Sequence, residues 1–199
     1  MKRMLLLVLL ALALPMAAFA NNSVDFTNSG GTLSGSSAGL SLSGSTLIAM
    51  GGSGGLITGS LGTVNFSTAG LISGNLQSGG TFDAGGSFTI AGNGTNGIFN
   101  GPIFTGSFSG PVTWTVITLA NGTHNYTLQG SLTGTWYSGA TVNGATVQLT
   151  INTGKSFFDG TTMISSGDTN IVVPEPGSLT LLGTGLVGLA GILRRKMKA

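Results

Sequence analysis

The chain has 199 residues, of which 36 are glycine and none is cysteine, and only 6% of its residues are charged. Between residues 21 and 172 a single lysine, Lys155, stands against four aspartates, which leaves this stretch with a net charge of −3. A nucleic acid partner is excluded, because binding to phosphates needs clustered cations and one lysine cannot supply them. Without disulfides, the fold has to rely on backbone pairing and apolar burial.

Residues 1–20 have the three parts of a secretory signal peptide. Two basic residues precede an apolar run of ten residues from Leu5 to Leu14, and Ala18 and Ala20 form an Ala-x-Ala cleavage site. The run is too short for a spanning helix, which needs roughly 20 residues. We therefore expect a signal peptide helix that engages the secretion translocon and is cut by signal peptidase after Ala20.

Residues 21–172 are predicted to form one extracytoplasmic all-β domain rich in Gly, Ser and Thr. An amphipathic helix of useful length is excluded there, because each interior glycine costs about 1 kcal/mol relative to alanine. Between the glycines, apolar and polar residues alternate, as in PVTWTV from Pro111 and ATVQLTI from Ala145. This alternation is typical of half-buried antiparallel strands.

Asn-Gly pairs, which tolerate the backbone of tight hairpin turns, recur along this domain. They begin at Asn93, Asn96, Asn100, Asn121 and Asn143. Residues 103–137 are predicted as a meander of four strands, IFTGSFSG, PVTWTVITLA, THNYTLQG and SLTGTWYS, packed into an antiparallel β-sandwich or a barrel-like domain. For residues 30–62 two alternatives stay open, namely strands of the same sandwich or coils of a small β-solenoid.

Residues able to carry chemistry are sparse in this domain. His124 is predicted to be a surface strand residue, because the sequence shows neither a nucleophile nor an orienting partner for it. The aspartates Asp25, Asp83, Asp159 and Asp168 are predicted to be turn or capping residues, since Asp beside Gly bonds its own backbone well. We expect no enzyme activity, no catalytic residue, no cofactor and no bound metal.

The aromatic residues are sorted by their position along the predicted strands. Trp114, Tyr126 and Trp136 share the parity of neighbouring apolar residues and are expected in the core. Tyr137 has the opposite parity, in company with Thr133 and Thr135. It is therefore the one candidate for an exposed ring that could stack on a sugar.

The C-terminus begins with an uncharged apolar run of 15 residues, from Leu179 to Leu193, followed by Arg194, Arg195 and Lys196. With Gly177 and Ser178 counted, the run has 17 residues, and a helix of that length spans about 25 Å and can cross the bilayer, because terminal arginines snorkel to the interface. The positive-inside rule keeps the basic cluster cytoplasmic. The run is thus predicted to be a transmembrane helix that stops transfer and leaves the domain outside.

The tetrapeptide Val173-Pro174-Glu175-Pro176 precedes this run. A residue before proline is held out of the α region, so the tetrapeptide is predicted to be extended, the form that a transpeptidase cleft accepts. In the order of this motif, the apolar span and the basic tail, residues 173–199 resemble a PEP-CTERM sorting signal.

The resemblance implies a Gram-negative bacterial protein exported through the general secretory route. Such a precursor is held in the inner membrane with its body in the periplasm, and an exosortase, a membrane-embedded cysteine transpeptidase, cuts it near the Pro-Glu-Pro. The resemblance further implies a link to extracellular polysaccharide and biofilm. A plain single-span anchor whose prolines are only a linker stays open as an alternative.

These features predict a structural protein of the cell surface or extracellular matrix. Its processing partners are the translocon, signal peptidase and exosortase, and exopolysaccharide is a further candidate partner. Two other functions stay open. One is a carbohydrate-binding adhesin that would use Tyr137, and the other is an extracellular polysaccharide hydrolase that would need Asp83 or Asp159.

Overall fold

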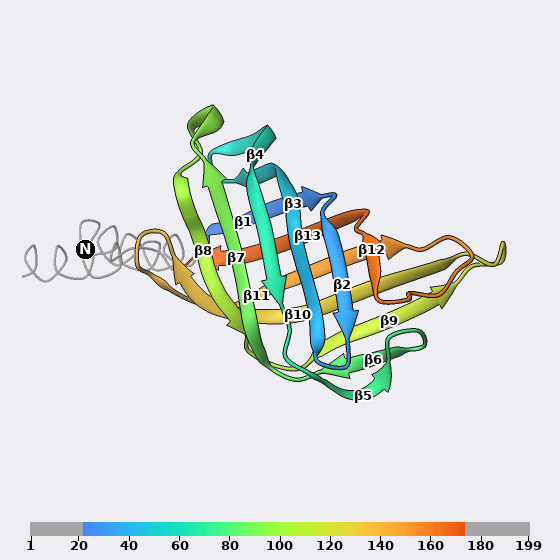
Figure 1. Cartoon of the computed structure of the whole chain (residues 1–199). Helices are drawn as coiled ribbons and strands as arrows, with labels where there is room; N and C mark the ends of the chain where they lie inside the picture. The colour runs from blue at the N-terminus through green and yellow to red at the C-terminus, as the bar shows by residue number, and fades with distance from the viewer. Residues whose placement is uncertain (1–21, 174–199) are drawn as a thin grey trace, which may run out of the picture. The chain divides into compact units, whose positions relative to one another are not determined.

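The computed structural model describes residues 22–173, which form antiparallel strands and one short 3-10 helix (Figure 1). The elements are β1 (Asn22–Ser29), β2 (Thr32–Ser36), β3 (Gly39–Gly52), β4 (Gly55–Ser67), β5 (Leu71–Asn75), β6 (Gly79–Phe82), β7 (Gly85–Asn93), η1 (Thr95–Gly97), β8 (Asn100–Phe108), β9 (Val112–Thr118), β10 (His124–Trp136), β11 (Thr141–Asn152), β12 (Thr161–Met163) and β13 (Ser166–Val173). The predicted mainly β fold is confirmed. Among these elements no helix is long and apolar enough to cross a membrane, and the predicted signal peptide and transmembrane helices lie outside the described residues.

Eight of the strands close into a barrel. The ring runs β11, β13, β1, β3, β4, β7, β8 and β10, and β10 pairs back onto β11. Neighbours in this ring run antiparallel, and an even number of antiparallel strands can close without a mismatch of direction. In Figure 1, β3, β4, β7 and β8 form the near layer, and β10, β11 and β13 cross behind it. The barrel-like alternative of the prediction is thus confirmed.

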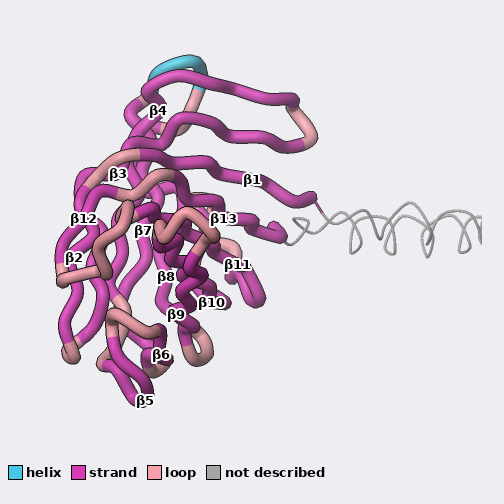
Figure 2. Tube along the Cα trace, turned by 90° about the vertical axis from the view of Figure 1, so that its right-hand side faces the viewer, coloured by secondary structure: helices cyan, strands magenta, loops and turns pink. Residues whose placement is uncertain are grey.

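Each of the long strands β3 and β10 pairs with two different strands along one of its edges, and these extra pairings add branches to the barrel. Residues 124–129 of β10 pair with β9, whereas residues 132–136 pair with β8. On β3, residues 39–43 pair with β2 and residues 46–51 pair with β1. The branches β12–β2 and β5–β6–β9 therefore extend one end of the barrel, where Figure 2 shows β2 and β12 apart from β5 and β6.

The predicted meander is wrong in two respects. The segments THNYTLQG and SLTGTWYS form one continuous strand, β10, and β10 lies between β8 and β9 instead of following them. Gly130, read as a break between strands, lies in the middle of β10. A Cβ atom there would come within 2.7 Å of Phe108 Cδ1 and 3.3 Å of Val112 Cγ2. This glycine makes room for a core ring and does not turn the chain.

The Asn-Gly pairs divide in the same way. Asn121 does lie in a turn, closed by bonds from Leu119 N to Thr123 O and from Gly122 N to Leu119 O. The pair at Asn143 instead lies within β11, where Gly144 has a φ of 79° at a shift of register against β10. Asn143-Gly144 therefore forms a β-bulge within a strand, whereas Asn121-Gly122 forms a turn between strands.

Residues 30–62 form strands of the same closed sheet. β1 pairs with β3, and β3 pairs with β4, both antiparallel. Of the two open alternatives, the strand reading is therefore correct and the solenoid is wrong.

The barrel interior is filled by aromatic and aliphatic side chains. Phe66 and Phe88 stack with ring centroids 6.0 Å apart, and Phe108 meets both edge-on at 5.9 and 6.2 Å. Trp114 and Tyr126 stack at 4.9 Å. All five rings are buried, as is Trp136, so the prediction from parity is confirmed for the three aromatic residues that it placed in the core.

Candidate functional site

The strand that leads into the sorting segment is held inside the closed sheet. β13 lies between β11 and β1, and its Ile171 is fully buried. On the outer face, the Asn170 amide donates a hydrogen bond to the Asp25 carboxylate on β1. The strand ends at Val173, and the following Pro174 has no backbone N–H to continue a ladder. The sorting segment thus follows directly on a strand anchored on both edges.

Most of the predicted sorting and processing residues fall outside the part of the chain that the structure describes, and their roles stay predictions. They are Ala18, Ala20, Pro174, Glu175, Pro176, Arg194, Arg195 and Lys196.

Comparison with known families gives one match. The profile of the PEP-CTERM protein-sorting motif covers residues 172–196. The chain carries a PEP-CTERM sorting motif. This confirms the resemblance seen in the sequence, and the matched range contains both the tetrapeptide from Val173 and the basic cluster from Arg194. No curated protein and no solved structure matches, and no family is shown for the central domain.

A PEP-CTERM motif marks an exported protein that begins as a membrane-anchored precursor in Gram-negative bacteria and is processed by an exosortase. The match begins at residue 172 and therefore overlaps the last two residues of β13. The PEP-CTERM motif of this chain is therefore continuous with the last strand of the barrel, without an intervening linker.

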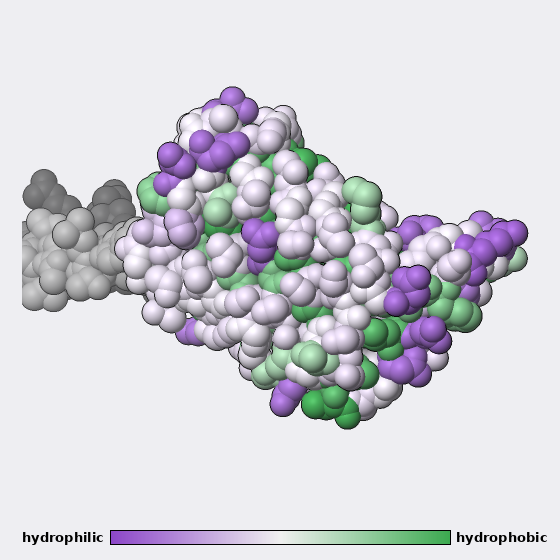
Figure 3. Space-filling model, viewed as in Figure 1, coloured by the Kyte–Doolittle hydropathy of each residue, from purple (hydrophilic) through white to green (hydrophobic). Residues whose placement is uncertain are grey.

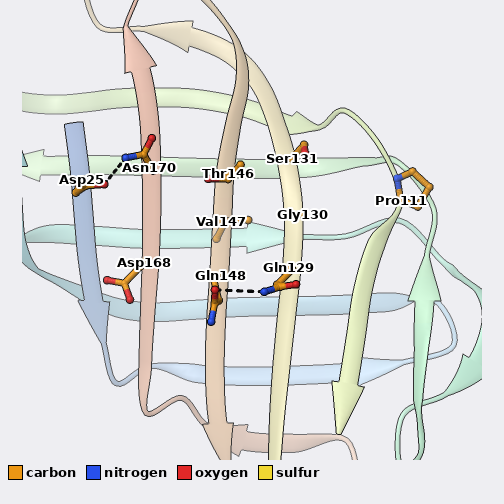
Figure 4. A pocket seen from close by; sticks show the side chains of 10 residues that line it. All are labelled: Asp25, Pro111, Gln129, Gly130, Ser131, Thr146, Val147, Gln148, Asp168 and Asn170. Atoms are coloured by element: carbon orange, nitrogen blue, oxygen red, sulfur yellow. Dashed lines mark hydrogen bonds between the residues drawn. The ribbon is translucent and has the colours of Figure 1, made fainter. Parts of the chain in front are cut away.

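The outer face of β10, β11, β13 and β1 carries an open depression of about 500 Å³. Figure 4 shows Asp25 and Asp168 on neighbouring strands at this depression, together with Gln129 and Gln148, whose amides hydrogen bond at 3.3 Å. Both aspartates lie within strands, β1 and β13, so their prediction as turn or capping residues is wrong. The two aspartates lie on one face of the barrel because β1 and β13 are neighbours in the ring. Their separation in the sequence gave no sign of this.

The other two aspartates lie elsewhere. The Asp83 carboxylate accepts a bond of 2.8 Å from the backbone N–H of Ala84, the local role that was predicted. Asp159 lies in the loop between β11 and β12, beside Phe157 in a polar depression of about 200 Å³. Within residues 22–173 no group of three His, Asp or Glu side chains is placed to hold a metal ion together.

His124 begins β10, but its prediction as a surface residue is wrong, because the side chain is only 6% exposed. Its Nδ1 lies 2.9 Å from Thr118 Oγ1, and its ring stacks on Phe157 at 4.1 Å. Phe157 lies in the loop after β11 and covers the imidazole. The contact joins two segments that are distant in the sequence, so a local sequence pattern could not predict it.

An apolar groove of about 320 Å³ lies at the end of the barrel where β10 ends. It is lined by Met50, Ile57, Gly97, Ile98, Phe99, Ile103 and Tyr137. Tyr137 is 54% exposed, as its parity predicted, and Phe99, which is 47% exposed, stacks on it at 5.1 Å. Phe99 was not among the residues predicted from the sequence. The only signal was an apolar pair, Ile98-Phe99, between two Asn-Gly turns.

Proposed function

We propose that this chain is a structural protein of the cell surface or extracellular matrix, linked to exopolysaccharide and biofilm. The observation that carries the proposal is the continuity of the PEP-CTERM motif with β13. Cleavage near the Pro-Glu-Pro leaves every strand described among residues 22–173 in place, because β13 spans Ser166–Val173. The processed domain therefore keeps a closed sheet, which has few free strand edges to unravel.

The surface chemistry supports a passive role in a hydrated matrix. The face seen in Figure 3 is largely pale, with strongly hydrophilic residues mainly at the loop above β7 and β8 and at the opposite tip. Ser, Thr, Asn and Gln side chains hydrogen bond to water and to sugar hydroxyls without carrying charge. We propose that the chain is not an enzyme and that signal peptidase and the exosortase supply the catalysis in its maturation.

The proposal is tested by the intact mass of the protein recovered from producing cells, with and without the exosortase gene. We expect the product of the complete strain to lack residues 1–20 and everything beyond the Pro-Glu-Pro region. Without the exosortase it should keep Arg194–Lys196. The double variant Pro174→Ala with Pro176→Ala should also keep the basic end, whereas Pro111→Ala, in the barrel domain, should be processed normally.

A basic end that is retained in the complete strain would contradict the proposal and favour the plain membrane anchor. Unchanged maturation of the double proline variant would show that the tetrapeptide is only a linker.

A carbohydrate-binding adhesin is the second candidate, and the exposed pair Phe99 and Tyr137 favours it. The third, a polysaccharide hydrolase, has the weakest support. The carboxylates named for it, Asp83 and Asp159, respectively cap a local turn and line a loop depression. Turnover of a polysaccharide that is lost in Asp83→Asn or Asp159→Asn would revive it.

A further inference from the structure

We propose that the groove beside Phe99 and Tyr137 binds one pyranose unit of a neutral polysaccharide. The idea rests on the proposed function in one respect, since an exported matrix protein is placed where it meets such polymers. The proposal adds the binding site, the stacking residues and the chemical class of the ligand.

The two rings form a stacking surface that is open to solvent. Their centroids are 5.1 Å apart with an angle of 24° between the planes, so each ring covers one face of the other. Exposed fractions of 54% and 47% leave the remaining ring surface accessible. The negative face of an aromatic ring attracts the weakly positive C–H groups of a pyranose. Met50 and Ile57 form an apolar wall of the same groove.

The loop that presents Phe99 is fastened to β4 before any ligand arrives. Asn93 Nδ2 and Thr95 Oγ1 donate to Ser60 O at 2.9 and 3.1 Å, and Asn96 Nδ2 donates to Thr58 O at 3.1 Å. Asn96 is also the one non-glycine residue among residues 22–173 with a positive φ, 52°. Such strain persists only where surrounding contacts hold it, and a preformed site avoids the entropy cost of ordering a loop on binding.

The charges select a neutral ligand. None of the residues that line the groove is ionisable except Tyr137. Lys155, the one cation between residues 22 and 173, follows Gly154, whose carbonyl accepts a bond from His124 N at the opposite end of β10. The 13 residues of β10 span about 40 Å. Within residues 22–173, a uronate or sulfated sugar would therefore find no counterion near these rings.

The test measures binding to the full-length chain in lipid nanodiscs by calorimetry and by tryptophan emission. Trp136 is a built-in reporter, because its ring lies 5.5 Å from Tyr137. The probes are cellohexaose and mannohexaose as neutral oligosaccharides and an alginate hexamer as the anionic one, with empty nanodiscs as the blank. We expect binding of at least one neutral probe with a change in emission, and no binding of alginate.

Phe99→Ala and Tyr137→Ala should each weaken neutral binding about tenfold, because the sugar stacks on the free face of one ring and the other ring supports that ring from behind. Tyr137→Phe keeps the ring and should retain binding. The matched control is Phe157→Ala, which truncates another half-exposed ring, stacked on His124 instead. It should bind like the unaltered chain. Unchanged urea midpoints for Phe99→Ala and Tyr137→Ala would show that their losses are not due to unfolding.

The proposal is overturned if neither neutral probe binds, if alginate binds as well as they do, or if both alanine variants bind normally. It is also overturned if the two rings only mediate association between copies, seen as a sedimentation change in the alanine variants without sugar binding. None of these outcomes affects the mass test of processing, so the two proposals fail separately.

Discussion

Replacing Gly130 by alanine tests directly whether glycines in this barrel make room for core rings. The added methyl group would lie 2.7 and 2.8 Å from Phe108 Cδ1 and Cε1, whereas carbon atoms prefer about 3.5–4.0 Å. Phe108 cannot swing away freely, because it meets Phe66 and Phe88 edge-on within the buried core. Overpacking of this kind costs about 2 kcal/mol, which corresponds to a fall in Tm of about 4–8 °C.

Unfolding in urea, followed by tryptophan emission, gives the free energy of unfolding. The matched control is Gly110→Ala, since a Cβ atom at Gly110 has nothing within 4 Å. Its change should lie within about 0.5 kcal/mol of zero, as for ordinary surface substitutions. Combining Gly130→Ala with Phe108→Leu should couple favourably by at least about 1 kcal/mol. Equal free energies of unfolding for Gly130→Ala and Gly110→Ala would refute the reasoning.

Two further substitutions test buried hydroxyls by the same urea unfolding. Tyr126 Oη donates to Gln77 O at 2.8 Å and accepts from Phe158 N at 3.1 Å, so Tyr126→Phe should cost about 1–3 kcal/mol, while Tyr137→Phe stays near zero. A loss below about 0.5 kcal/mol, the range of ordinary surface substitutions, would contradict this role. Thr169 Oγ1 is buried without a hydrogen-bond partner, so Thr169→Val should raise stability by about 1 kcal/mol; a decrease would indicate a hidden partner.

The strand faces could be predicted because side chains alternate with period two in any β-strand. Trp114 and Tyr137 were assigned to opposite sides on this basis, and the structure agrees. The same local logic failed at Gly130 and Asn143. A glycine that turns the chain and a glycine that admits a neighbouring ring look alike in one dimension, because the ring comes from a distant strand.

In the candidate sites too, features set within one strand were predicted, and contacts between distant segments were not. Tyr137 was predicted from its own strand, but Phe99 was not, because the two rings meet only when the loop after β7 folds against the end of β10. The proximity of Asp25 and Asp168 likewise depends on β1 and β13 closing the ring. His124 is buried because Phe157, from the loop after β11, stacks on it. The strand pattern around His124 could not predict this burial.

By itself, the sequence determined that the domain is all-β and that its C-terminus carries a sorting motif, since both are written in short contiguous patterns of apolar, proline and basic residues. Only the tertiary structure decided that the sheet closes into a barrel, which glycines lie beneath rings and which aromatic side chains form a groove. Those outcomes depend on strand register between segments far apart in the chain, where contact energy selects among pairings that local preference leaves nearly equal.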